Sequence, residues 1–116
     1  MTVEDLQKIS LSLPGVTEDI KWESHLCFSI GGKMFLVTSP DIVPSSASFK
    51  VPAEDFHEII AHDGFEKHAY LGRHNWVRLD DINRISVKEL ETYIRGSFNL
   101  VSAKLSLKKK KLLGII

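Results

Sequence analysis

The sequence predicts an α+β protein in which an antiparallel β-sheet carries helices packed on one of its faces. Short stretches of alternating apolar and polar residues indicate strands, and two of these stretches are joined by only Gly31-Gly32. Helical spacing of apolar residues is confined to the start of the chain, a short middle segment and a long segment near the end. Because hairpins outnumber helical crossovers, we expect the order α-β-β-β-α-β-β-α in one domain, residues 1–116, with a basic C-terminal tail from about residue 104.

Length and composition agree with this class. A chain of 116 residues, 43% hydrophobic and 26% charged, resembles one ordinary globular domain. No apolar run approaches the roughly 20 residues of a membrane span, and the first residues lack the basic and then apolar pattern of a signal peptide. We therefore expect a cytoplasmic protein that has no membrane partner. The single cysteine, Cys27, excludes an intrachain disulfide.

The first helix is predicted from Leu6, Ile9 and Leu13, which recur at helical spacing. Thr2 and Asp5 in front of them resemble a capping box with a shorter acid. Pro14-Gly15 ends this helix. The polar segment 16–23 that follows is a connection, or a short strand, leading into the hairpin.

The hairpin covers residues 25–38, and its two central glycines permit the positive φ angles of a type I′ turn. If these two residues form the whole loop, the register follows directly. The facing pairs are then Ile30 with Lys33, Phe28 with Phe35, and Leu26 with Val37, while Cys27 and Leu36 share the opposite side. One face of the hairpin is therefore strongly apolar and requires cover from helices.

A third strand is predicted where Ala47, Phe49 and Val51 alternate with polar residues. Pro52 then suits the first position of a short helix, which Gly64 ends.

Two further strands are predicted over residues 66–71 and 73–80, separated by Gly72. Alternation assigns Val77 and Leu79 to the core and places His74, Trp76 and Arg78 on the opposite side.

The last helix begins at a capping box formed by Ser86 and Glu89. Its apolar stripe consists of Leu90, Tyr93, Ile94, Phe98, Val101 and Leu105. Gly96 inside this helix suggests a close approach of another part of the backbone.

Several of these segments together resemble the MmcQ/YjbR family. They are, in order, LPGV and TED, the lone Trp22, GGKMF, the strand SFKV before a short helix, the strand HNWVRLD, and a last helix followed by KKK. The likeness runs from Leu13 to about Lys110. It implies a CyaY-like α+β fold and the "double wing" DNA-binding role proposed for the family. The sequence departs from the family pattern at Glu23-Ser24, where a glycine would follow Trp22, and in the LLGII that extends past the lysines.

No pattern in the sequence indicates catalysis. There is no GxSxG elbow and no glycine-rich phosphate loop, and His57 and His62 are five residues apart rather than the four that would stack two metal ligands on one helix face. We therefore expect a protein that is not an enzyme and that holds no metal and no cofactor.

The candidate binding site combines basic and aromatic side chains near the last two strands, namely Lys67, His68, Tyr70, Arg73, His74, Trp76 and Arg78. Cations of this kind meet phosphates, and flat rings stack on unpaired bases. The hairpin tip at Lys33 and the turn at Arg73 are the candidate wings. Lys50 and the tail lysines Lys108, Lys109, Lys110 and Lys111 are expected to add backbone contacts.

These residues support a DNA-binding domain, but two other interpretations remain open. Tyr70 and Trp76 are equally well explained as packing residues covered by arginines. Alternatively, Trp76 and Trp22 line a patch or pocket of a module that binds a small molecule or a protein. The overall pI near 7 favours this second class, although the five lysines after residue 103 leave the rest of the chain with a charge of about −5.

Overall fold

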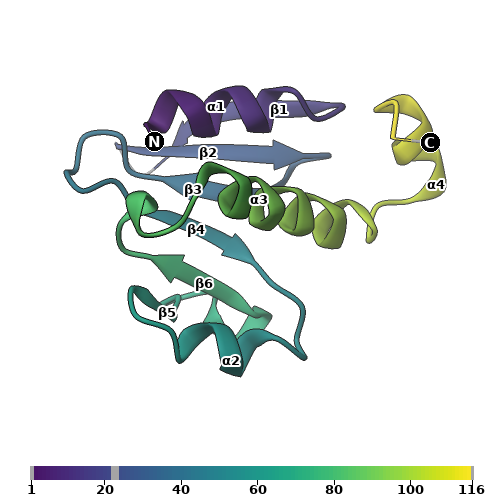
Figure 1. Cartoon of the computed structure of the whole chain (residues 1–116). Helices are drawn as coiled ribbons and strands as arrows, with labels where there is room; N and C mark the ends of the chain where they lie inside the picture. The colour runs from purple at the N-terminus through teal and green to yellow at the C-terminus, as the bar shows by residue number, and fades with distance from the viewer. Residues whose placement is uncertain (1, 22–23, 116) are drawn as a thin grey trace.

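A computed structural model of the chain describes residues 2–21 and 24–115 and contains one six-stranded antiparallel sheet (Figure 1). The strands are β1 (Val16–Lys21), β2 (His25–Ile30), β3 (Lys33–Thr38), β4 (Ala47–Lys50), β5 (Phe65–Lys67) and β6 (Trp76–Leu79). Their order across the sheet is β1-β2-β3-β4-β6-β5. The predicted antiparallel sheet is confirmed.

The helices are α1 (Val3–Leu11), α2 (Phe56–Ile60), α3 (Val87–Ser102) and α4 (Leu107–Leu112), with 3-10 turns η1 (Gly72–His74) and η2 (Ile82–Arg84). Helices α1 and α3 lie side by side over the sheet, and α4 lies beyond the end of α3 (Figure 1). Within the described residues, none of these helices has the length and apolar character needed to cross a membrane.

The element order contains one helix more than predicted, α4 after the long helix, and of the two alternatives for the segment before the hairpin the strand is the observed one, β1. The four central residues of β1 are all exposed, so the strand lacks the alternation that identifies a half-buried strand. Helix α4 contains the basic run predicted as a tail, and the Ser106 hydroxyl caps it by accepting from the Lys109 N–H at 3.1 Å.

The main core lies between the sheet and α1, α2 and α3, as the hairpin's apolar face requires. The predicted turn is confirmed, since Gly31 and Gly32 both have positive φ. The predicted register is wrong beyond the turn, because a β-bulge makes Phe28 pair with Leu36. The extra residue at Phe35 turns both Phe35 and Leu36 into the core, where the Phe35 ring meets Phe98 of α3 at 5.5 Å.

The bulge also changes the opposite face of the sheet. Val37, rather than Leu36, joins Cys27 there, and Trp76 completes this second buried cluster. Val77 and Leu79 are fully buried in the main core, as predicted.

The last two predicted strands are shorter than expected. After Lys67 the chain turns, because His68 Nδ1 accepts from the N–H groups of Tyr70 (3.1 Å) and Leu71 (3.0 Å). Residues 72–74 then form η1, and Asn75 adopts a left-handed conformation before β6 begins. The basic and aromatic residues are therefore divided between short strands and a compact turn, not spread along two long strands.

The short helix also begins later than predicted. Pro52 opens a turn, in which its carbonyl accepts from the Asp55 N–H at 3.0 Å, and α2 starts at Phe56.

Candidate functional site

The candidate site lies where β3 and β4 separate. Their pairing runs from Thr38 and Ala47 to Leu36 and Phe49, and beyond this point β3 continues to the hairpin tip without β4. The buried hydroxyl of Ser97, on α3, spans the gap. It donates to the Phe35 carbonyl at 2.6 Å and accepts from the Lys50 N–H at 2.9 Å. One side chain of the covering helix thus replaces a missing bond of the ladder and holds Lys50 at the edge of the opening.

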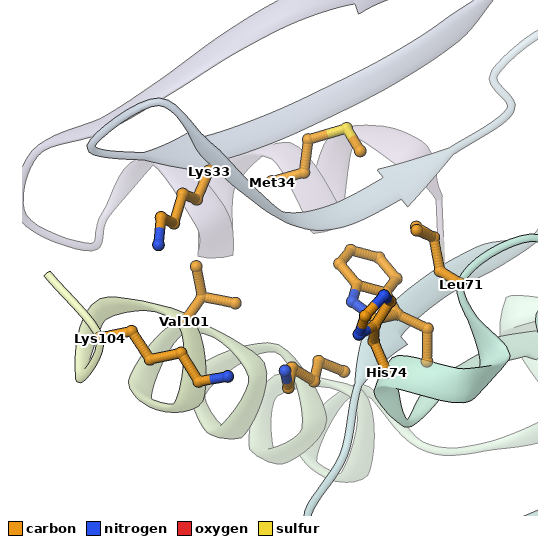
Figure 2. A pocket seen from close by; sticks show the side chains of 8 residues that line it. Lys33, Met34, Leu71, His74, Val101 and Lys104 are labelled. Carbon is orange, nitrogen blue, oxygen red and sulfur yellow. The ribbon is translucent and has the colours of Figure 1, made fainter.

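A cavity of about 220 Å³ occupies this opening, and we call it the lysine cleft. It is lined by Lys33, Met34, Lys50, Leu71, His74, Trp76, Val101 and Lys104. Figure 2 shows the side chains of Lys33 and Lys104 reaching toward the same space from β3 and from the end of α3, with His74 on another side. Of the residues that the structure describes, three lysines and no acidic residue line the cleft.

The charges in the cleft oppose one another. Burial lowers the pKa of Lys50, and the neighbouring ammonium groups of Lys104 and Lys33 lower it further. An anion placed among these groups reverses that balance, because it favours the protonated form of every lysine that it meets. The geometry therefore suits a phosphate or another compact anion.

Trp76 forms the inner wall of the cleft but is only 5% exposed. It packs with Cys27 and Val37, with Met34 and Leu71 against the edge of this cluster. This favours the interpretation of Trp76 as a packing residue over its interpretation as an exposed stacking platform. Tyr70, by contrast, is 86% exposed.

The structure brings four of the predicted site residues together in the lysine cleft: Lys33, Lys50, His74 and Trp76. It places Lys67 and Arg78 at a different cavity, where Arg78 forms an ion pair with Glu66 at 2.9 Å. Arg73 is exposed on η1. Trp22, the other proposed pocket residue, lies outside the described residues.

The predicted tail lysines, Lys108–Lys111, lie on α4 and not on a free arm. Lys109 Nζ donates to the Gly31 carbonyl at 3.1 Å, and the Leu105 side chain lies against Gly31. Leu113 and Ile115 pack on the main core. The C-terminal segment is therefore docked on the hairpin turn, two residues from Lys33.

Besides apolar lining residues, the sequence-based prediction missed two polar residues of this site, Lys104 and Ser97. Lys104 lies in the turn after α3, where its N–H donates to the Val101 carbonyl, but in the sequence it resembles the start of a basic tail. Ser97 interrupts the apolar stripe between Ile94 and Val101, and a polar residue at such a position is a signal for a buried hydrogen bond.

Comparison with known proteins identifies solved structures with the same fold and the family of the chain. A protein of Deinococcus radiodurans with a DUF419 domain is 27% identical, and its crystal structure superposes with a TM-score of 0.88, covering 97% of this chain and 88% of that chain. A Pseudomonas syringae protein, 16% identical, shares the fold with a TM-score of 0.72 over 87% of this chain and 99% of its own. No curated protein matches the chain. The YjbR family matches residues 11–100, and since this is most of the sequence, the chain belongs to the YjbR family.

Proposed function

We propose that this domain binds DNA by contacting the phosphate backbone at the lysine cleft. The observation that carries the proposal is the convergence of Lys33, Lys50 and Lys104 on one cavity, with no acidic residue in the part of its lining that the structure describes. Phosphate oxygens accept hydrogen bonds from ammonium groups and neutralise their charge.

The distribution of charge over the chain favours DNA binding at the lysine cleft over binding elsewhere on the surface. Residues 104–116 contain five lysines and no acid, whereas the remainder of the chain carries a charge of about −5. The basic helix α4 is attached to the hairpin turn beside Lys33, so a strand of DNA at the cleft also meets the lysines of α4. The acidic remainder repels phosphates elsewhere.

The burial of Trp76 limits the mode of binding. Because its ring is enclosed by the sheet-face cluster, it offers no free face for an unpaired base. Binding therefore rests on the backbone, and we expect little dependence on base sequence and a strong dependence on salt.

The test is a fluorescence-anisotropy titration of labelled duplex and single-stranded DNA at several salt concentrations. Lys104→Ala should weaken binding and lower the salt slope of the duplex complex by about 0.9 if one phosphate contact is lost. The matched control is Lys88→Ala, because Lys88 is also exposed and lies at the other end of α3, about 20 Å away along the helix.

Wild-type protein that fails to bind either DNA at low salt would refute the proposal, since electrostatic association is strongest there. Equal losses in the Lys104 and Lys88 variants would also refute it, because they would assign any binding to overall charge and not to the cleft.

A further inference from the structure

A second, larger cavity lies on the sheet face opposite α1 and α3, and it points to a small-molecule site. Its volume is about 810 Å³. Its floor includes Val37, Ser48 and Arg78, which stand beside one another on β3, β4 and β6. The loop of residues 39–46 and the turn of residues 68–71 provide its sides.

Three serine hydroxyls line this cavity, from Ser39, Ser46 and Ser48, and we call it the serine cavity. These residues are only 5%, 6% and 5% exposed. Among the described residues, none of the three hydroxyls has a hydrogen-bond partner in the protein. Within the described part of the chain, these three hydroxyls are not sealed from solvent, so each is available to bond a molecule that enters the cavity.

The remaining walls are largely apolar, with Met34, Val37, Ile42 and Leu71 around the hydroxyls. Ligand sites in proteins commonly have such apolar walls, a few converging polar groups, and a volume of about 300–1,000 Å³. The serine cavity has all three properties.

The charged groups at the cavity define the polar end of the ligand. Arg78 pairs with Glu66 through one of its nitrogens, which leaves other guanidinium N–H groups available, and Lys67 adds a second cation. His68 is held neutral, because burial and the charge of Arg78 lower its pKa. Its Nδ1 accepts two backbone N–H groups, so its proton resides on Nε2. Among the described lining residues, the two cations Lys67 and Arg78 exceed the one acid, Glu66, and several donors accompany them, which matches a singly charged acceptor.

We propose that the serine cavity binds a small monocarboxylic acid with an apolar body, whose carboxylate meets Arg78, Lys67 and the serine hydroxyls. This site is separate from the lysine cleft. Among the described lining residues, the two share the apolar side chains of Met34 and Leu71 but no cationic group.

The test is a titration of the full-length ¹⁵N-labelled protein with phenylacetate, followed by NMR. Uncharged phenylacetamide and inorganic phosphate serve as matched probes of the charge and the apolar body. Phenylacetate should shift the amide signals of Ser46, Ser48 and residues 68–71 saturably, with a dissociation constant on the order of 0.1–1 mM. Phenylacetamide and phosphate should bind this cavity at least about tenfold more weakly.

Two serine variants test whether phenylacetate binds in the serine cavity. Ser48→Ala should weaken phenylacetate binding about fivefold or more while leaving the protein folded, because this hydroxyl has no partner within the described chain. Ser10→Ala is the control, since Ser10 is an equally buried serine on α1, among the helices that cover the other face. Its affinity for phenylacetate should match that of the wild type.

Four results would overturn the inference. They are the absence of saturable shifts, equal binding of the amide, an unchanged affinity of Ser48→Ala, and shifts centred on Lys33 and Lys104. Shifts that depend on protein concentration without ligand would assign the face to a second copy of the chain instead. None of these outcomes changes the result of the DNA titration, so the two proposals fail independently.

Discussion

Replacing Ser97 by alanine removes the single hydroxyl that connects β3, β4 and α3. In the wild type this hydroxyl satisfies the Phe35 carbonyl at 2.6 Å and the Lys50 N–H at 2.9 Å, and Ser97 itself is fully buried. Ser97→Ala therefore leaves two backbone groups without partners at the point where the sheet opens. The substitution creates little empty space, so its effect reports on these hydrogen bonds.

The magnitude follows from the burial of the two groups. A buried polar group that loses its partner costs about 1–3 kcal/mol. Phe35 is fully buried and bears this cost, whereas Lys50 is half-buried, so water relieves part of the cost at its N–H. Alanine returns up to about 0.5 kcal/mol through its higher helix propensity. We expect Ser97→Ala to lower the free energy of unfolding by about 2–3 kcal/mol.

Urea denaturation followed by circular dichroism measures this change. With a slope of about 1–3 kcal/mol per molar urea, the midpoint should fall by about 1–2 M. The control is Ser102→Ala in the same helix, since within the described residues that buried hydroxyl bonds only the Asn99 carbonyl one turn away, at 3.4 Å. It should change stability by less than about 0.5 kcal/mol. Equal midpoints for the two variants would show that Ser97 does not hold the strands together.

Four other predictions follow from the packing and charges. Trp76→Ala should cost about 3–5 kcal/mol of stability in a denaturation experiment, because the ring is buried in the sheet-face cluster. Gly96→Ala should raise the melting temperature by an amount equivalent to about 0.5–1 kcal/mol, since a Cβ there meets no atom of the described residues within 4 Å, so the close approach predicted from the sequence is wrong. Ending the chain after Ser106 should cost about 2 kcal/mol, measured by urea titration, because it removes apolar contacts such as those of Leu113. Burial lowers the pKa of His68 below its ordinary value of 6.5, so as the pH falls the unfolded state takes up a proton at this residue before the folded state does. The free energy of unfolding, measured by urea titration, should therefore decrease as the pH drops below about 6.5. His68→Asn should reduce that decrease.

The hairpin shows which features local sequence predicts and which it does not. Two adjacent glycines determine the turn, and both adopt the positive φ angles that such a turn requires. The same reasoning fails a few residues later, because the pairing of Phe28 depends on the bulge at Phe35. This bulge buries two successive side chains, Phe35 and Leu36, in the core, where Phe35 meets Phe98 of α3, a helix from a distant part of the chain.

For the candidate site, too, the sequence predicts some of the residues but not their arrangement. Lys33, Lys50 and His74 stand out in the sequence as basic residues near turns or strand ends, but nothing in their spacing brings them together. Their convergence depends on the gap between β3 and β4 and on the position of α3, since Lys104 lies in the turn that follows this helix. The sequence also does not predict the serine cavity. Serines at alternate positions of a strand usually indicate a solvent-exposed face, and here the folded loop of residues 39–46 encloses them.

The sequence alone determined the α+β class, the apolar faces of β4, β6 and α3, the hairpin turn and the resemblance to the YjbR family. These properties depend on local periodicity and turn chemistry, to which each residue contributes with its near neighbours. The tertiary structure alone decided that Trp76 is enclosed, that the basic tail is a docked helix, and that three lysines share one cleft. These properties depend on contacts between residues far apart in the chain, and such contacts form only where packing brings separate elements together.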